Sequence, residues 1–251
     1  MTSISKREPP LPWNQNETSW LTYPRPSFFP LFSSYIYNLL TDAESVREAT
    51  TSVLQSFVDD GVVYLELRTT PRATPELTPD ELVTTITSAI RDFERENPEL
   101  HTRLILCVDR RHDLPTAEGI LDLALQHRGI VVGLDLCGDP TVRTGGEIAL
   151  FTPVFQRAAA EGLPITVHFA EAEASSSKKE LDVLLSWNPR RLGHVIWEDE
   201  ETRAEIARRG LCLELCLSCN VQAGMIRGGF ESHHFGHWKD IQGPSISLAV
   251  G

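Results

Sequence analysis

The 251-residue sequence contains no long apolar run, no excess of positive charge and no regular cysteine framework. A helix that crosses a membrane needs roughly 18 or more consecutive apolar residues, and no stretch reaches that length. The segment Met1–Trp20 is polar and proline-rich and has no apolar core of a secretory signal. We therefore expect a soluble, cytoplasmic protein that does not associate with membranes.

Lys and Arg total 23 against 35 Asp and Glu, which gives a formal net charge of −12. Non-specific binding to nucleic acids needs clustered positive charge that displaces counterions from the phosphates. The composition therefore argues against that function. It is compatible with a phosphorylated small molecule, because one or two arginines can hold a phosphate.

The five cysteines are odd in number and lie within apolar segments. This distribution is typical of reduced, buried thiols in an intracellular protein. The pair Cys216-x-x-Cys219 suggests a zinc or redox motif, but the sequence has no second pair. Cys212 and Cys216 also alternate as the core residues of a strand do, so we interpret these cysteines as structural.

Apolar segments alternate with amphipathic helices along most of the chain, and seven of them are predicted as strands. Most have the continuous apolar character of parallel strands that are buried on both faces. They are Val62–Arg68, Arg103–Asp109, Ile130–Leu136, Ile165–His168, Arg191–His194, Leu211–Cys216 and Ser245–Ala249. The alternation predicts an α/β fold. We divide the chain into an extended or disordered segment, residues 1–26, and one barrel domain, residues 27–251.

Capping residues mark several helix starts. Three Thr-x-x-Glu sequences predict capping boxes, and they are Thr41–Glu44, Thr78–Glu81 and Thr144–Glu147. The apolar periodicity predicts further helices over about residues 115–127, 147–161, 178–187 and 199–209. The aromatic stretch Phe28–Tyr37 predicts a buried helix near the start of the domain.

Polar side chains fall at or just after the ends of nearly all predicted strands. They are Glu66, Arg68, Asp109, Asp135, Asp139, His168, Glu171, His194 and Glu214. Active sites of (β/α)8 TIM barrels are assembled from the carboxyl ends of many strands, whereas those of open sheets gather at one crevice. The pattern favours a TIM-barrel-type fold over an open sheet. Because a barrel has eight strands, the first strand is expected to be missing.

Seven segments at these strand ends resemble, in their order along the chain, the adenosine deaminase superfamily, and most closely its N6-methyl-AMP deaminase branch. They are Tyr64–Arg72, Val108–Arg111, Val132–Pro140, His168–Glu171, Arg191–His194, Leu213–Ser218 and His233–Gly236. Each motif alone is weak, but the ordered set is specific. The resemblance implies an incomplete (β/α)8 metallohydrolase barrel that uses Zn²⁺.

The resemblance also implies roles for individual residues. It makes His168 a zinc ligand, Glu171 the proton donor to the purine ring, and His194 the residue that accepts or orients a proton of the attacking water. Substrate binding is implied for Glu171 and for a further set, which is Thr69, Thr70, Pro71, Arg72, Asp109 and Gly138. In this chemistry zinc activates the water, side chains transfer protons, and ammonia or methylamine leaves.

Two motifs of the family do not occur in the sequence. The His-x-His that supplies two zinc ligands is absent, since the first histidine is His101. The Asp-Asp pair expected after Leu248 is replaced by Ala249, Val250 and Gly251. A tight zinc site needs three or four protein ligands. We therefore expect a family member that is cut at both edges of its barrel and does not retain zinc through His168 alone.

Without the resemblance, the same residues have simpler interpretations. His168 and His194 are then ordinary histidines of the core, and Glu171 is a solvated acid in a loop. Asp135 and Asp139 are residues of an ordinary turn after a strand. Arg68 and Arg72 form either a phosphate clamp or salt bridges with Glu66 or Asp109. The histidines near the end of the chain are interpreted as a loop and helix at the barrel mouth rather than as a metal cluster, and they are His233, His234 and His237.

Three hypotheses about function follow from these observations. The first is a zinc-dependent deaminase that converts an adenine nucleotide such as N6-methyl-AMP to IMP. The second is a catalytically impaired protein that keeps part of the nucleotide pocket, with unpaired sheet edges that promote aggregation. The third is another metallohydrolase of the superfamily, which would not require a 5′-phosphate. The expected partner is a purine nucleotide bound to a monomeric chain.

Overall fold

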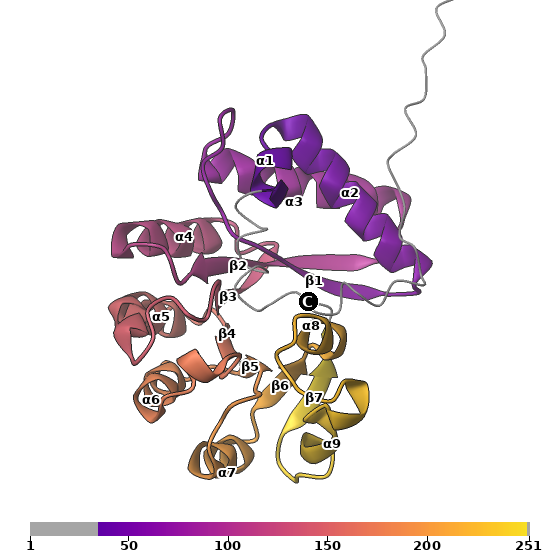
Figure 1. Ribbon diagram of the computed structural model, residues 1–251. Helices are drawn as coiled ribbons and strands as arrows, with labels where there is room; N and C mark the ends of the chain where they lie inside the picture. The colour runs from indigo at the N-terminus through magenta and orange to yellow at the C-terminus, as the bar shows by residue number, and fades with distance from the viewer. Residues whose placement is uncertain (1–34, 250–251) are drawn as a thin grey trace, which may run out of the picture.

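The computed structural model describes residues 35–249, whose strands form one curled parallel sheet (Figure 1). The strands pair in chain order, and they are β1 (Tyr64–Thr69), β2 (His101–Asp109), β3 (Val131–Cys137), β4 (Ile165–Phe169), β5 (Arg191–His194), β6 (Cys212–Leu215) and β7 (Ser245–Leu248). Every predicted strand is present, within two residues at each end. Among the described residues, β1 and β7 are the edge strands.

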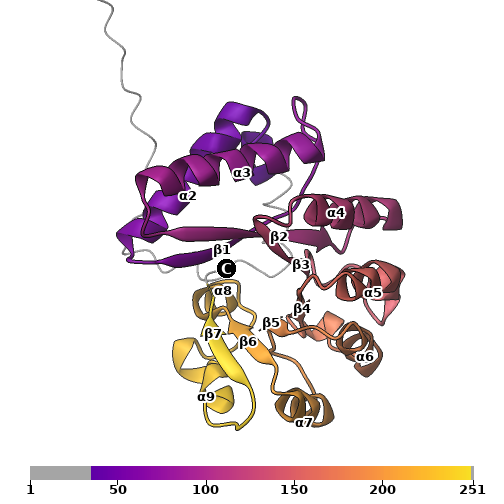
Figure 2. The same ribbon diagram turned by 180° about the vertical axis from the view of Figure 1, so that it is seen from behind.

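Most helices cover the outer, convex face of the sheet, as the two opposite views show (Figures 1 and 2). The α-helices of the described residues are α1 (Tyr37–Leu39), α2 (Ala43–Asp59), α3 (Pro79–Glu96), α4 (Leu114–Gln126), α5 (Thr152–Ala160), α6 (Lys178–Ser186), α7 (Glu200–Arg209), α8 (Leu217–Gln222) and α9 (Phe235–Trp238). This alternation around a curled parallel sheet confirms the predicted TIM-barrel-type α/β fold with an incomplete set of strands.

The core lies between the sheet and the inward faces of these helices. Leu104 and Leu134 on the strands and Leu121 on α4 are completely buried. Trp187, just after α6, stacks on Phe155 of α5 with ring centroids 4.3 Å apart and planes within 3°. Complete burial of one such apolar side chain contributes about 1.5–3 kcal/mol, so the helices are held to the sheet mainly by apolar packing.

One of the three predicted capping boxes is confirmed, and two are wrong. Thr78 and Glu81 cap α3, with Pro79 in the first turn. The N-cap of α2 is Asp42, whose carboxylate accepts the Ser45 N–H at 2.8 Å, so the helix begins one residue later than predicted. Thr144 caps no helix, because the chain first forms the 3-10 turn η4 (Glu147–Phe151). Proline lacks an N–H and fits the first helical turn, so α5 begins only at Thr152-Pro153.

A buried ion pair connects the loop after β2 to α6. Arg110 Nη2 lies 2.7 Å from Glu180 Oε1, and both side chains are at most 2% exposed. Arg143 donates to the backbone oxygens of Arg110 at 2.7 Å and His112 at 2.8 Å. An unpaired buried charge is strongly destabilising, so these contacts hold the loop at the carboxyl end of β2 in place.

Some predictions fall outside the described residues. These are the extended or disordered segment, residues 1–26, and most of the helix predicted over Phe28–Tyr37, of which the structure describes only the last residues. Within residues 35–249, no helix has the length and apolar character needed to span a bilayer.

Candidate active site

Parallel pairing places the carboxyl ends of all strands at one edge of the curled sheet. The candidate site residues at this edge form two groups. The β1–β3 group contains Thr70, Asp109 and Gly138, and the β4–β6 group contains Glu171, His194 and Asn220, which follows β6 on α8. The structure therefore brings residues that are far apart in the sequence to one edge, as the strand-end pattern predicts.

His168, the predicted zinc ligand, lies on β4 with its ring against the carboxylate of Asp135 on β3. Its Nδ1 is 3.3 Å from each of the two Asp135 oxygens. Burial alone would lower the pKa of His168, but the Asp135 carboxylate raises that pKa to about 9. The imidazole is therefore charged at neutral pH, and a metal ion would have to displace its proton.

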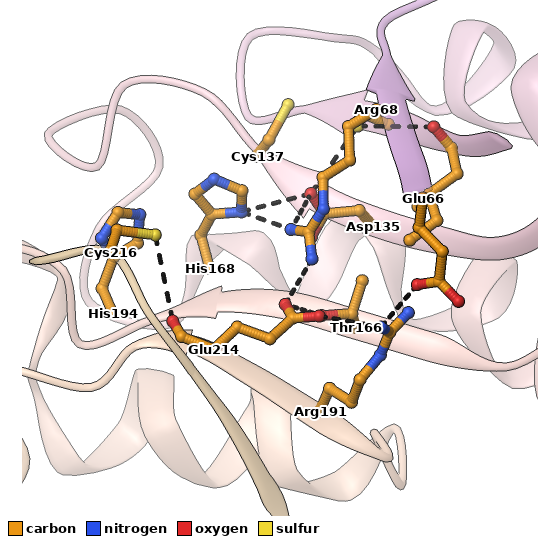
Figure 3. Close-up of polar contacts among 12 residues, drawn as sticks. Glu66, Arg68, Asp135, Cys137, Thr166, His168, Arg191, His194, Glu214 and Cys216 are labelled. Carbon is orange, nitrogen blue, oxygen red and sulfur yellow. Dashed lines mark hydrogen bonds and ion pairs between the residues drawn. The ribbon is translucent and has the colours of Figure 1, made fainter. Parts of the chain in front are cut away.

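A series of ion pairs crosses the interior of the curled sheet (Figure 3). Arg68 on β1 pairs with Asp135 at 3.1 Å and with Glu214 on β6. Arg191 on β5 pairs with Glu66 at 2.6 Å and with Glu214 at 3.0 Å. Positive and negative side chains thus alternate across the interior, and they join β1 to strands on the opposite side. The alternative prediction of a salt bridge from Arg68 to Glu66 is wrong.

Glu171 and His194 are both buried and lie next to each other at the ends of β4 and β5. His194 Nε2 is 3.5 Å from Glu171 Oε1, and the ring centroids of His194 and His168 are 5.1 Å apart. Burial lowers the pKa of His194 despite the neighbouring carboxylate. Glu171 Oε2 is buried and has no hydrogen-bond partner within residues 35–249. The pair therefore offers a neutral imidazole and a carboxyl oxygen that a ligand can use.

Asp109 and Gly138 are in direct contact in the β1–β3 group. Arg111 binds both carboxylate oxygens of Asp109, with Nε–Oδ1 2.9 Å and Nη2–Oδ2 2.7 Å. Burial would raise the pKa of Asp109, but the hydrogen bonds from Arg111 hold it below its usual value. Gly138 has φ +98°, and a Cβ there would lie 2.6 Å from Asp109 Oδ1. Glycine is required for this contact, which leaves an ionised carboxylate beside bare backbone.

The predicted binding segment from Thr69 to Arg72 leaves the end of β1 and runs toward α1. Thr70 Oγ1 lies 3.7 Å from Cys137 Sγ, and Pro71 is buried. Arg72 donates to the Leu40 carbonyl at 3.0 Å and lies over the Tyr37 ring, 4.4 Å from its centroid. The alternative of a salt bridge from Arg72 to an acid near the strand ends is therefore wrong. Arg72 belongs with Tyr37 and not with the Glu171–His194 pair.

The described residues do not fit a metal ion by themselves. No cluster of three or more His, Cys, Asp or Glu side chains within residues 35–249 could hold one. Burial raises the pKa of Cys216 to about 12 and that of Cys219 to about 11. Both sulfurs stay protonated thiols, which are poor metal ligands. These two thiols therefore do not supplement His168, the zinc ligand that the resemblance implies.

Sequence reasoning missed three side chains that hold the site together. Arg111 binds Asp109, Asn220 hydrogen-bonds His194, and His233 hydrogen-bonds Asn220. Arg111 and His233 lie within motifs that carried the resemblance, and Asn220 lies two residues after another. The signal that could have drawn attention to these residues was their position in or near a motif. That position does not indicate which side chains they contact.

The sequence and the fold of this chain are similar to those of known proteins. Residues 7–235 match the family model described as adenosine deaminase. The N6-methyl-AMP deaminase of Danio rerio is 31% identical over an alignment of 260 residues, which covers 98% of this chain and 73% of that protein. The N6-methyl-AMP deaminase of Homo sapiens is 34% identical over 230 residues, which covers 87% of this chain and 63% of that protein. The crystal structure of Arabidopsis ADAL complexed with IMP has a TM-score of 0.81 at 30% identity, and it covers 90% of this chain and 66% of that chain. The chain thus spans between 63% and 73% of the length of these relatives.

Proposed function

Because the chain belongs to the adenosine deaminase family, we propose that it supplies nucleotide-binding and proton-transfer residues for the hydrolytic deamination of adenine nucleotides. The proposed substrate is N6-methyl-AMP and the product is IMP. The observation that carries the proposal is the buried Glu171–His194 pair, together with the Asp109–Gly138 contact at the same edge of the sheet. Two relatives of this chain are N6-methyl-AMP deaminases, and a similar structure contains IMP.

In the proposed reaction, water adds to C6 of the purine as a ring nitrogen takes up a proton. The C6–N bond then breaks, and the water oxygen stays on C6 as a carbonyl. Of the two water protons, one goes to the leaving methylamine and the other restores the protonated form of Glu171. Glu171 in its protonated form donates to the ring nitrogen through Oε2, which has no other partner among residues 35–249. His194 interacts with the attacking water, because its ring lies beside Glu171 and His168. Proton transfer by a positioned side chain contributes typically about 10²–10⁴-fold to a rate.

The β1–β3 group binds the nucleotide in this proposal. Asp109 accepts hydrogen bonds from the ligand, and the bare backbone of Gly138 allows close approach. Arg72, with Thr69, Thr70 and Pro71, is assigned to the 5′-phosphate. The observed partners of Arg72 are an aromatic ring and a carbonyl oxygen, and no carboxylate among residues 35–249 neutralises its positive charge.

Zinc is part of the proposal, with His168 as one ligand. Zinc supplies an activated water at neutral pH in enzymes of this type. A tight site needs three or four ligands, and residues 35–249 contain no such set. In this proposal residues 35–249 therefore supply substrate binding and proton transfer. Activation of the water by zinc would need ligands in addition to His168.

The test is a deamination assay with the 251-residue chain. N6-methyl-AMP, AMP, N6-methyladenosine and adenosine are incubated with the protein, with and without added zinc, and the products are separated chromatographically. We expect IMP from the nucleotides and no product from the nucleosides. Equal activity on nucleosides would indicate another barrel hydrolase. No product from any of the four compounds in the presence of zinc would contradict the proposal.

A second candidate function is nucleotide binding without deamination. It is favoured by the interior ion pairs, because the positive charges of Arg68, Arg191 and the protonated His168 balance the carboxylates of Glu66, Asp135 and Glu214. The interior is thus electrostatically satisfied without a metal ion. Titration calorimetry with IMP, together with zinc analysis, distinguishes the two functions. Binding without zinc or turnover supports the second, and stoichiometric zinc with turnover excludes it.

We also propose that the protein acts as a monomer in the cytoplasm. All five cysteines are unpaired in the structure, which suits a reducing compartment. Sedimentation velocity over a range of protein concentrations and localisation of a tagged chain test these two statements. A concentration-dependent dimer or a secreted product would contradict them.

A further inference from the structure

A chain of hydrogen bonds connects His194 to the segment that leads into α9. His194 Nδ1 lies 2.8 Å from Asn220 Oδ1, and Asn220 Nδ2 lies 3.2 Å from His233 Nε2. The backbone N–H of Phe235 donates to His233 Nδ1 at 3.0 Å. The three side chains are at most 6% exposed. Because water has little access to them, their donors and acceptors have to match one another.

The contact with Phe235 determines where His233 carries its proton. A neutral imidazole has an N–H at one nitrogen and a lone pair at the other. The backbone N–H of Phe235 is always a donor, so His233 Nδ1 holds the lone pair and Nε2 holds the proton. Burial lowers the pKa of His233, which keeps the ring neutral. His233 therefore directs a donor at Asn220.

Asn220 has to present an acceptor to that donor. With Nδ2 toward His233, two donors would face each other across 3.2 Å. A rotation of the amide by half a turn exchanges its oxygen and nitrogen and leaves the shape of the side chain unchanged. In this orientation Asn220 accepts from His233 Nε2 and donates to His194 Nδ1. All links of the chain are then satisfied.

We propose that Asn220 and His233 are positioning residues that hold the proton of His194 on Nε2. The Nε2–H then faces Glu171 Oε1, 3.5 Å away, which is an acceptor. The opposite tautomer would turn the Nε2 lone pair toward the same carboxylate oxygen and would leave His233 without an acceptor. Both ends of the hydrogen-bond chain thus require the same tautomer.

A separate contact holds the backbone of His194. This residue ends β5 with φ +67°, a left-handed conformation that is uncommon for residues other than glycine. His234 donates through Nε2 to the His194 carbonyl at 2.5 Å. His233 and His234 are stacked, with ring centroids 4.2 Å apart. Two adjacent histidines therefore control the proton and the backbone of His194.

The consequence for the reaction rests on the proposed function. A ring with its proton on Nε2 offers a donor on the side that faces Glu171. It orients the attacking water by donating to the water oxygen, and it does not remove a proton through Nε2. Of the two roles that the resemblance implies for His194, the hydrogen-bond chain favours orientation.

The tautomer is measured by two-dimensional NMR of the full chain labelled with ¹⁵N-histidine, because protonated and unprotonated ring nitrogens differ in chemical shift. Signals of His194 are identified by their loss in His194→Gln. We expect the proton on Nε2 of both His194 and His233. Asn220→Asp replaces the amide donor with an acceptor, so it is expected to bring a proton onto His194 Nδ1. His237→Gln, at an exposed position on α9, is the matched control and should leave both tautomers unchanged.

A wild-type His194 with its proton on Nδ1 would overturn the proposal, and this measurement needs a variant only to identify the His194 signals. An Asn220→Asp protein that is folded and still lacks a proton on Nδ1 would also overturn it. The NMR readout needs no substrate, so a failure of the proposed function is detected separately in the deamination assay. If turnover is present, Asn220→Asp should lower kcat by roughly tenfold with a much smaller change in KM.

Discussion

The β1–β3 group and the β4–β6 group lie at the same edge of the sheet but are stabilised differently. Charges are paired in the first, where Arg111 binds Asp109 and Glu180 binds Arg110 in the loop behind. In the second, His194 is a buried neutral imidazole held by hydrogen bonds, and one oxygen of Glu171 has no partner within residues 35–249.

In the proposed function, this difference separates the residues that bind the nucleotide from those that transfer protons. Ionised groups that are already paired keep their charge and position, so they form a constant surface for binding. A neutral imidazole beside an unpartnered carboxyl oxygen can exchange protons with a bound molecule. The following predictions test whether the two groups can be disturbed independently.

The largest effect is expected for Glu171→Gln, which removes the proposed proton donor and keeps the shape of the side chain. We expect kcat for N6-methyl-AMP to fall by about 10²–10⁴-fold, with the Kd for IMP changed little because Asp109 and Gly138 are untouched. Steady-state kinetics and calorimetry measure the two quantities. Glu173→Gln, exposed two residues later, is the control and should be as active as the wild type. Equal loss in both variants would refute the role of Glu171.

The second-largest effect is expected when the buried ion pair behind the β1–β3 group is broken. Glu180→Gln leaves the buried guanidinium of Arg110 without its counterion, and the free energy of unfolding should fall by about 3–5 kcal/mol. Urea denaturation followed by circular dichroism measures it. Asp182→Asn on the same helix breaks only the exposed pair with Lys178, and should cost about 0–1 kcal/mol. Similar losses of unfolding free energy in the two variants would show that the buried pair contributes no more to stability than the exposed pair.

The third prediction concerns acid, to which Asp109 of the β1–β3 group and His234, which holds the backbone of His194, respond in different pH ranges. Burial lowers the pKa of His234 to about 4 from its ordinary value of 6.5. Between these values the unfolded chain binds a proton that the folded chain does not, so the free energy of unfolding falls as the pH decreases, by roughly 3 kcal/mol at most. The Asp109 pKa is lowered below its ordinary value of 3.8, so its contribution is present above that pH and is lost only as the pH falls further.

Urea denaturation of the wild type and of His234→Gln between pH 7 and pH 4.5 measures the His234 contribution. The variant should lose less stability over this range, whereas His237→Gln should behave as the wild type. A variant with the same pH dependence as the wild type would show that burial of His234 does not govern stability in this range.

The smallest effect is expected for Gly138→Ala. The added Cβ would meet the Asp109 carboxylate, and the positive φ is strained for alanine, so we expect a loss of about 1–3 kcal/mol in unfolding free energy and weaker binding of IMP. Gly119→Ala on α4 is the control, because a Cβ there meets nothing within 4 Å. It should stabilise the helix by roughly 0.5–1 kcal/mol. A neutral Gly138→Ala would mean that the Asp109 contact does not require glycine.

Local sequence patterns were sufficient to locate the strands and to place Asp109, Glu171 and His194 at strand ends. A parallel strand that is buried on both faces has a continuous apolar sequence. This pattern does not depend on distant parts of the chain. Helix starts were less predictable. Asp42 competes with Thr41 as the N-cap, and Pro153 delays α5, so small differences between neighbouring residues decide where a helix begins.

The amino-acid sequence by itself determined the order of strands and helices, the TIM-barrel-type fold and the edge at which the polar side chains gather, because apolar periodicity and strand direction are local properties. Only the tertiary structure decided that Arg68 meets Asp135 and Glu214, and that Asn220 lies between His194 and His233. These partners lie on different strands, on α8 and in the segment before α9. They meet because the sheet curls, and the degree of curl follows from the packing of all strands and helices together.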